Sequence, residues 1–496
     1  MKKLGLLVLS SFMVIPLTNA GAYTLPDRAG FTKTPVVTVG GFVDFYGGSA
    51  SQTGVYDSEN LPDDDKDDTN TVGTQNKNGD SMNFSNESEI HIEVNGINDL
   101  GMKYGAIVEL EANITNDSES NDINADKAYI FSESMYGKLE FGNTNGVAHN
   151  MKLGAETFAR GAGGINGEYL NHINLPMVVH QSYSNSGSAN YIDDYNAVSR
   201  PPRFILIPQH PLDHGGYAKG FYDDITDADI INYCEQQDHA NADTGAIDNS
   251  IELKCYNDQK TKRNLEFGDN EDATKVSYYT PRIGGLQLGV SYTPDSGDIG
   301  TAAHNTSNTS GNVENVIDWG LSYSDTIGNV GLAISVTGQQ GDFEEAMSGA
   351  NTRENLDSIE YGANLSYFGL IFGGSYGEWR NSLYEKKDAT GDYDTLYNGV
   401  KKPGDASYYT AGLAYEFGPF AISGTYFTSE FQENEYEAYS IGVDYKAAVG
   451  FMPYAEVTTY KFTSLQPTSD KSLAEDRQRL RDNKGSVGMI GVLMSF

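Results

Sequence analysis

The chain has 496 residues, of which 69 are Asp or Glu and 33 are Lys or Arg, so its formal net charge is -36 at pH 7. Such a surface repels nucleic acid, so no nucleic-acid partner is expected, and its field favours cations. The 55 Gly, 33 Tyr and 21 Phe, against 2 Cys and 2 Trp, suit many short strands with aromatic ends. With a mean hydropathy of -0.47, this composition excludes a disulfide-dense scaffold and a helical membrane protein.

The first residues have the pattern of a secretory signal peptide. Two lysines precede an apolar run over residues 4–17, and small residues follow it. The run is shorter than the roughly 20 residues that a membrane-spanning helix needs, which disfavours a retained helix. We therefore expect a signal peptide at residues 1–22, cleaved after Ala20 or Ala22, and an exported domain over residues 23–496.

Apolar residues at every second position recur in segments of about ten residues, the length of a tilted transmembrane strand. In residues 358–368, for example, Tyr361 and Leu365 alternate with polar Glu360 and Asn364. We predict about sixteen strands, at residues 35–47, 82–94, 102–113, 123–132, 136–142, 273–280, 285–293, 315–325, 329–338, 358–368, 370–378, 407–417, 419–430, 435–446, 450–462 and 485–496.

Short and long connections mostly take turns along this series. The turns at Gly369 and Gly418 are brief, whereas the segments at residues 48–81 and 379–406 are long. A soluble sandwich has no reason to segregate its loops, but an outer-membrane barrel has tight turns at one end and long loops at the other. The sequence therefore predicts an all-β fold, a transmembrane antiparallel up-and-down β-barrel.

Several segments resemble the general porins of Gram-negative bacterial outer membranes. They are the hairpin at residues 275–294, the opening at residues 37–41 and the strand end at residues 136–142. The chain ends on Phe496, similar to the terminal aromatic that the outer-membrane assembly machinery recognises. The resemblance implies a homotrimer of sixteen-stranded barrels among outer-membrane lipid and lipopolysaccharide, with a third loop folded inward to narrow each pore.

The third loop is expected over residues 143–272. Its insert at about residues 197–262 is longer than a constriction loop needs, and Asn143 stands where related strands often have arginine, so pore size and charge do not carry over from the resemblance. The candidates for the constriction are Glu156, Arg160 and Glu168.

Polar faces of the predicted strands are expected to line the lumen, and acids prevail on them. The candidates for the lumen wall are Glu109, Glu111, Lys138, Glu360, Asp444 and Lys446. Because a pore lined by one sign of charge concentrates counter-ions, we expect passive diffusion of small hydrophilic solutes with a preference for cations. A substrate-specific channel for a sugar or another small solute stays open as an alternative, as does a surface adhesin or receptor barrel.

Two further groups of residues are candidates for a disulfide and for metal binding. Cys234 and Cys255 lie in the insert of an exported chain, where a disulfide is expected. His210 and His214 have a spacing that zinc sites use, but no second ligand pair accompanies them, which favours scattered loop histidines. No cofactor is expected apart from a candidate structural Ca²⁺, for which a solvated acidic loop is the favoured alternative. Its candidate ligands are Asp63, Asp64, Asp65, Asp67 and Asp68.

An enzyme is not expected. A hydrolase built on a barrel wall would need a base beside a nucleophile. Of the eight histidines only His91 lies in a predicted strand, on the same face as Glu89 and Glu93, and no Gly-x-Ser-x-Gly motif occurs. These residues leave little from which to build a catalytic site.

Overall fold

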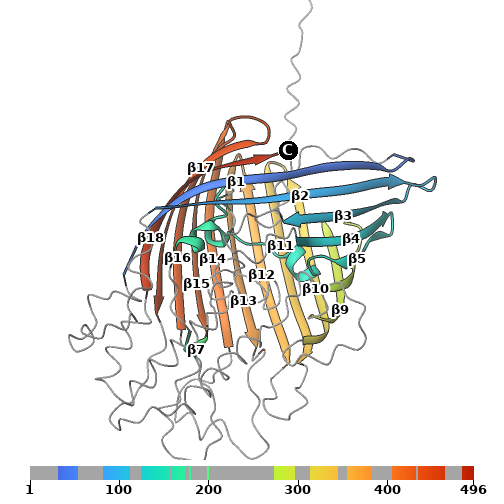
Figure 1. Cartoon of the computed structure of the whole chain (residues 1–496). Helices are drawn as coiled ribbons and strands as arrows, with labels where there is room; N and C mark the ends of the chain where they lie inside the picture. Colours follow the sequence, from blue (N-terminus) through green and yellow to red (C-terminus); the bar gives the residue numbers. More distant parts are fainter. Residues whose placement is uncertain are drawn as a thin grey trace, which may run out of the picture.

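Sixteen strands close into one antiparallel barrel in the computed structural model of the chain (Figure 1). Each barrel strand pairs with the strands before and after it, and β1 pairs with β18 to close the ring. The structure describes residues 32–53, 82–111, 124–156, 158–159, 161–173, 178–179, 198–199, 273–296, 313–343, 355–380, 382, 405–431, 434–463 and 483–496.

All sixteen predicted strands are confirmed, although their ends shift by a few residues. The barrel strands are β1 (Val36–Thr53), β2 (Asn83–Ile97), β3 (Lys103–Glu111), β4 (Asn124–Ser134), β5 (Gly137–Asn143), β8 (Thr274–Tyr279), β9 (Leu286–Asp295), β10 (Val313–Ile327), β11 (Val330–Phe343), β12 (Leu356–Tyr367), β13 (Leu370–Arg380), β14 (Asp405–Phe417), β15 (Phe420–Phe431), β16 (Asn434–Tyr445), β17 (Phe451–Thr463) and β18 (Asn483–Ser495). Between β5 and β8 lie α1 (Val147–Met151), η2 (Gly164–Asn166), η3 (Glu168–His172) and the paired two-residue strands β6 (Val178–Val179) and β7 (Val198–Ser199).

The alternation along each strand sorts side chains into an apolar outer face and a polar lumenal face. In β12, Tyr361 and Leu365 are 44% and 41% exposed, whereas Glu360 and Asn364 are 2% and 3% exposed. Directly opposed residues of an antiparallel pair share a face, so the register extends this assignment from strand to strand. Thr337, opposite Glu360 on β11, is accordingly buried on the lumenal side.

Aromatic side chains form two rows on the outer face. Toward the long connections, the Tyr376 ring lies 6.4 Å from that of Tyr361 and 4.7 Å from that of Tyr409. Toward the tight turns, Phe417 and Phe420 stack at 5.7 Å, and further rings flank them. Such rows at both ends of an apolar band are the aromatic girdles of outer-membrane barrels.

Tight turns join the strands at one end. The turn between β12 and β13 has positive φ at both central residues, 47° at Phe368 and 83° at Gly369. This is the type I′ geometry, whose twist matches that of the flanking strands.

The helices among the described residues are too short or too polar to span a membrane.

The segment after β5 folds into the barrel (Figure 1). Its helix α1 contacts β9, β10 and β11, η2 contacts β15, β16 and β17, and η3 contacts β18 and β1. The segment therefore follows the inner wall around much of the ring. This confirms the inward-folded third loop for residues 144–156, 158–159 and 161–173, called the inner loop below.

Candidate functional site

The inner loop lies so close to the barrel wall that glycine is required beneath it. A Cβ atom at Gly362 would overlap the carbonyl oxygen of Leu153, and one at Gly442 would lie 2.7 Å from Cβ of Ala159. Four further lumenal glycines face Val147, Met151, Ala155 or Phe158 in the same way, namely Gly289, Gly320, Gly373 and Gly412. These lumenal glycines thus leave the space in which the loop packs against the wall.

Wall carboxylates accept hydrogen bonds from the loop backbone. The amide of Gly161 donates to Oδ1 of Asp444 at 2.9 Å, and that of Gly164 donates to Oε2 of Glu456 at 3.1 Å. Hydrogen bonds to an ionised acceptor are stronger than neutral ones. Asp444 and Glu456 therefore fasten the loop to the wall.

The start of the inner loop is fastened through hydroxyl groups. The amide of Val147 donates to Ser291 at 3.0 Å, and the Ser291 hydroxyl donates to Asp318 at 2.8 Å. One turn later, the side-chain amide of Asn150 donates to the Tyr279 hydroxyl at 2.8 Å. Helix α1 is therefore held by polar contacts to β8 and β9, beside its apolar contacts.

Aromatic rings on five neighbouring strands pack with the far part of the loop. The rings of Trp379, Tyr408, Phe427 and Tyr436 follow one another at 5.5, 6.1 and 6.0 Å. The hydroxyls of Tyr436 and Tyr169 of η3 are hydrogen-bonded at 2.8 Å, and burial raises the pKa of Tyr169 well above its ordinary value. The same core cluster includes Tyr460 and the loop residues Ala162, Ile165, Leu170 and Ile173.

The constriction candidates occupy different positions. Glu156 is only 3% exposed, and burial raises the pKa of its carboxyl, opposed by the nearby Lys152 and by backbone hydrogen bonds. Glu168 is partly exposed and accepts a hydrogen bond from the Tyr46 hydroxyl at 2.5 Å. Arg160 lies outside the described residues. The part that these three residues play in a constriction stays a prediction.

His172 lies beside Glu168 at the end of η3, a position that the sequence did not single out. Its ring packs edge-on against the ring of Tyr46 at 5.9 Å, and burial lowers its pKa. The loop thus ends against β1 in a neighbourhood that contains both an acid and a histidine.

Most of the wall candidates lie on the lumenal face. The register places Glu109 and Glu111 of β3 on the face of β2 that carries His91 and Glu89. On the same criterion Glu360 and Asp444 face inward, and both are buried.

The two lysine candidates differ. Nζ of Lys138 lies 2.5 Å from Oε1 of Glu140 and 5.5 Å from the centre of the Phe131 ring. Lys446 follows the end of β16, where it is exposed and its amide donates to the carbonyl of Pro419 at 2.8 Å. It lies among the tight turns rather than along the wall.

Several lumenal acids were missed from the sequence. Asp44 is 1% exposed and accepts a hydrogen bond from the Tyr454 hydroxyl at 2.9 Å. The sequence pattern did not reveal the lumenal position of Asp44, because β1 carries aromatic residues on both faces. Tyr46 is 2% exposed and Phe45 is 53% exposed. If the outward-facing Val43 is taken as the start, strict alternation along this strand assigns Asp44 to the lumenal face.

Acids outnumber bases on the described lumenal face. By register, the acids include Asp44, Glu87, Glu89, Glu93, Glu109, Glu111, Glu133, Glu140, Asp295, Glu314, Asp318, Glu360, Glu416, Asp444 and Glu456, and the bases include His91, Lys103, Lys127, Lys138 and Lys275. Three of these lysines pair with wall acids, as Lys103–Glu133, Lys127–Glu109 and Lys138–Glu140. The balance of the wall is therefore negative.

A closed antiparallel barrel with an apolar outer face, a charged lumenal face and an inward loop has the architecture of an outer-membrane β-barrel. The family model described as Gram-negative porin matches residues 20–198 and 216–465. The chain belongs to the Gram-negative porin family. Family and barrel together indicate the outer membrane, and they are those of channels rather than of enzymes.

Similar proteins include two that carry no assigned function. They are uncharacterized proteins of Rickettsia bellii (strain RML369-C), 27% identical, and Rickettsia conorii (strain ATCC VR-613 / Malish 7), 26% identical, each over 268 residues. Each alignment covers 46% of this chain and 57% of the relative. The chain thus spans little more than half the length of the curated relatives it matches.

Solved structures extend the likeness at the level of the fold. The anion-selective porin from Comamonas acidovorans superposes with a TM-score of 0.50 at 12% identity, covering 93% of this chain and 100% of that chain. A triple mutant of the Rhodopseudomonas blastica porin, also 12% identical with the same coverage, gives a TM-score of 0.43.

Proposed function

We propose that the chain is an outer-membrane channel for the passive diffusion of small hydrophilic solutes and ions, and that it prefers cations. The observation that carries the preference is the surplus of acids on the described lumenal face. The Debye length is about 10 Å at about 0.1 M salt, comparable to the radius of a diffusion pore, so wall charges act across the water in the lumen.

The ion preference depends on this chain's own lumenal side chains. The porin from Comamonas acidovorans is anion-selective, but at 12% identity its likeness to this chain concerns the fold alone. In this chain the described lysines of β3 to β5 lie against wall carboxylates, which compensate their charge. The remaining acids set the sign of the field.

A substrate-specific sugar channel would need exposed aromatic faces along the pore. The lumenal rings on β13 to β16 are buried instead, with Trp379 at 3%, Tyr408 at 1% and Phe427 and Tyr436 at 0% exposure. They belong to the core that holds the inner loop, which favours general diffusion. An adhesin or receptor role would depend on the acidic loops, which lie outside the described residues.

The proposal includes export and assembly. A signal peptide at residues 1–22 directs export, Phe496 marks the last strand for the assembly machinery, and three copies form a trimer in the outer membrane. Oxidation outside the cytoplasm joins Cys234 to Cys255. These cysteines and the candidate Ca²⁺ ligands at residues 63–68 lie outside the described residues, and their roles stay predictions.

Swelling of liposomes that contain the purified protein distinguishes diffusion from specific transport. With neutral sugars of increasing size, we expect rates that fall smoothly with size and do not saturate with concentration. One sugar that enters far faster than others of its size, at a saturable rate, would support the substrate-specific alternative. Liposomes with heat-unfolded protein provide the control.

A further inference from the structure

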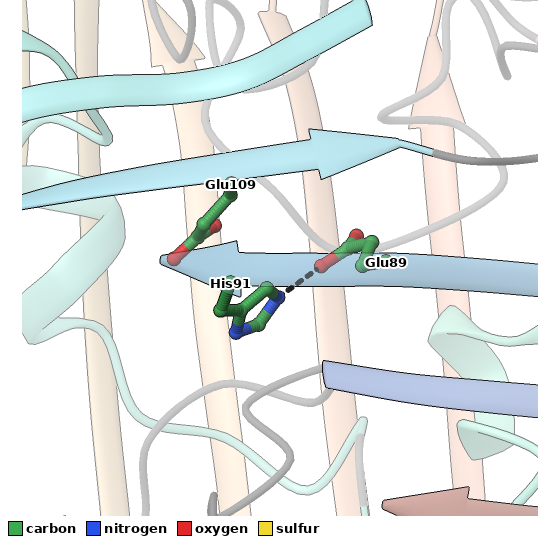
Figure 2. Close-up of side chains that lie close together, drawn as sticks. All are labelled: Glu89, His91 and Glu109. Carbon is green, nitrogen blue, oxygen red and sulfur yellow. Dashed lines mark hydrogen bonds and ion pairs between the residues drawn. The ribbon is translucent and has the colours of Figure 1, made fainter. Parts of the chain in front are cut away.

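Three potential metal ligands converge on the lumenal wall at β2 and β3. Glu89 and His91 are two residues apart on β2 and share its lumenal face, and Glu109 lies directly opposite His91 on β3. One ligand atom from each of the three side chains lies within 4.8 Å of the other two (Figure 2). Among the described residues, no other group of three His, Cys, Asp or Glu side chains brings its ligand atoms this close together.

The donor set suits zinc. One imidazole nitrogen and two carboxylate oxygens are ligands that Zn²⁺ accepts, with water in a fourth position. Zinc–ligand bonds of about 2.0–2.2 Å place tetrahedral ligand atoms roughly 3.4 Å apart. Shifts of little more than an ångström would bring the three ligand atoms to this spacing, and rotations of the two glutamate side chains can supply them. Their exposed fractions, 20% for Glu89, 13% for His91 and 17% for Glu109, leave the site open to lumenal water.

Neighbouring groups orient the imidazole and add negative charge. The His91 ring packs edge-on against Phe42 at 6.4 Å, and its Nε2 lies 2.7 Å from Oε2 of Glu89 in a hydrogen bond. Glu111 lies directly opposite Glu89, where its carboxylate adds to the negative charge. A dication bound between these side chains gains from the negative charge of the carboxylates.

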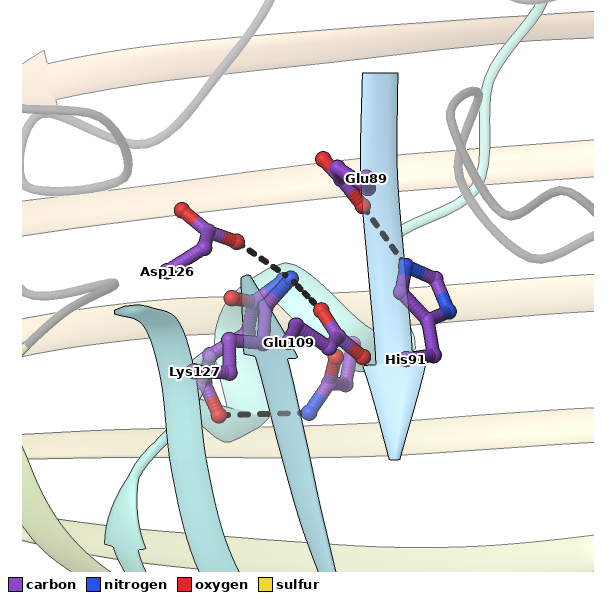
Figure 3. Close-up of polar contacts among 7 residues, drawn as sticks. Glu89, His91, Glu109, Asp126 and Lys127 are labelled. Carbon is purple, nitrogen blue, oxygen red and sulfur yellow. Dashed lines mark hydrogen bonds and ion pairs between the residues drawn. The ribbon is translucent and has the colours of Figure 1, made fainter. Parts of the chain in front are cut away.

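One ammonium group competes for the site. Nζ of Lys127 lies 2.9 Å from Oε2 of Glu109 and 3.1 Å from Oδ2 of Asp126 (Figure 3). The pair carries a single positive charge against two carboxylates, so a divalent ion that brings two positive charges can displace this lysine. The competition also provides a test, because removing the lysine should strengthen metal binding at this site and at no other.

We propose that Glu89, His91 and Glu109 bind one Zn²⁺ ion on the lumenal wall. The site is a property of the folded barrel and does not depend on ion preference or on solute specificity. Binding is therefore measured directly, apart from conductance. The ion also lies where it would offset part of the negative field of β2 and β3.

The experiment uses the full chain purified from membranes in detergent, stripped of metal with a chelator, and a chromophoric chelator that competes for Zn²⁺. We expect His91→Gln and Glu109→Gln to weaken zinc binding at one site by at least about tenfold. Lys127→Gln should tighten it several-fold. Glu133→Gln is the matched control, since it removes a lumenal carboxylate that also pairs with a lysine but has no place in the cluster. The heat-dependent shift of each variant on a gel confirms that it is folded.

Three results would overturn the proposal. Folded His91→Gln and Glu109→Gln barrels could bind zinc as tightly as the unaltered chain. The site could instead be lost in a His210→Gln/His214→Gln variant and kept in His91→Gln, which would assign it to the long loop. Mg²⁺ or Ca²⁺ could compete with Zn²⁺ at equal concentration, which would indicate a general attraction to acids.

Discussion

Gly442 shows how single residues of the wall control the inner loop. Valine at this position would place side-chain atoms where Ala159 now lies. Overpacking of this kind costs about 1–3 kcal/mol, so we expect Gly442→Val to displace the loop from the wall and to change the single-channel conductance.

The control for this change is Gly424→Val on the neighbouring strand. A Cβ atom at Gly424 meets nothing closer than the Ser440 carbonyl oxygen at 4.0 Å. This variant should conduct like the unaltered protein. If both valine variants conduct alike, close packing of the loop on the wall does not set the pore.

Glu156 makes the docking of the loop depend on pH. Because burial raises its folded pKa above the unfolded value, the folded state binds the proton more tightly. Its contribution to stability is then greatest below the ordinary glutamate pKa and is lost as pH rises toward the raised value. We expect Glu156→Gln to remove this loss. The midpoint temperature of the heat-dependent gel shift, measured from acid to neutral pH, tests it, and an equal pH dependence in both proteins would contradict it.

Not every residue of the site could be predicted from sequence. Alternation identified Glu360 and Asp444 as lumenal, because their strands are apolar on one face only. It did not identify Asp44, whose strand has aromatic residues on both faces, nor Lys127, which the pairing of β3 with β4 places opposite Glu109. Which residues face each other across two strands depends on how the strands pair. The alternation along a single strand does not contain this information.

At the scale of elements, the inner loop is fastened by acceptors on several strands. Asp444→Ala leaves the Gly161 amide without its charged acceptor, a loss of about 1.5–3 kcal/mol. We expect hydrogen exchange at this part of the loop to speed up by roughly tenfold or more. Asp444→Asn keeps an acceptor oxygen and should change exchange far less. Equal exchange in the two variants would show that this bond does not hold the loop.

Phe496 extends the pairing between β18 and β1 that closes the barrel. The Phe496 amide donates to the Gly41 carbonyl at 3.0 Å, and the Gly41 amide donates to the Phe496 carbonyl at 3.1 Å. Deleting Phe496 removes both bonds and an outward aromatic ring that is 48% exposed. We expect less folded barrel in the outer membrane, with export unchanged, and near-normal assembly for Phe496→Tyr. Normal amounts of the deleted form, measured by the gel shift of membrane fractions, would refute this role.

Elements were predictable to different degrees. Period-two alternation located every barrel strand, because one face meets lipid and the other faces the lumen. The path of the inner loop was not predictable, since it depends on wall glycines such as Gly362 and Gly412 that lie far away in sequence.

At the scale of the whole molecule, the barrel separates two environments. Its outer face carries aromatic rows at both ends, separated on β14 by the residues between Tyr409 and Phe417, a span of roughly 27 Å at about 3.4 Å per residue. Because barrel strands tilt by about 35–45°, this span is roughly 20 Å along the membrane normal, close to the apolar band of about 25 Å in outer-membrane barrels. The lumenal face collects acids, and the inner loop lies among them, so in the proposed channel conduction and ion choice depend on the same surface.

The reversal potential of single channels across a salt gradient tests this account most directly. We expect stepwise conductance with a reversal potential that favours the cation of the salt, strongest at low concentration and weaker as salt screens the wall charges. A reversal potential that favours the anion at low salt would contradict the charge argument, and a folded barrel that gives no conductance steps would contradict the channel itself.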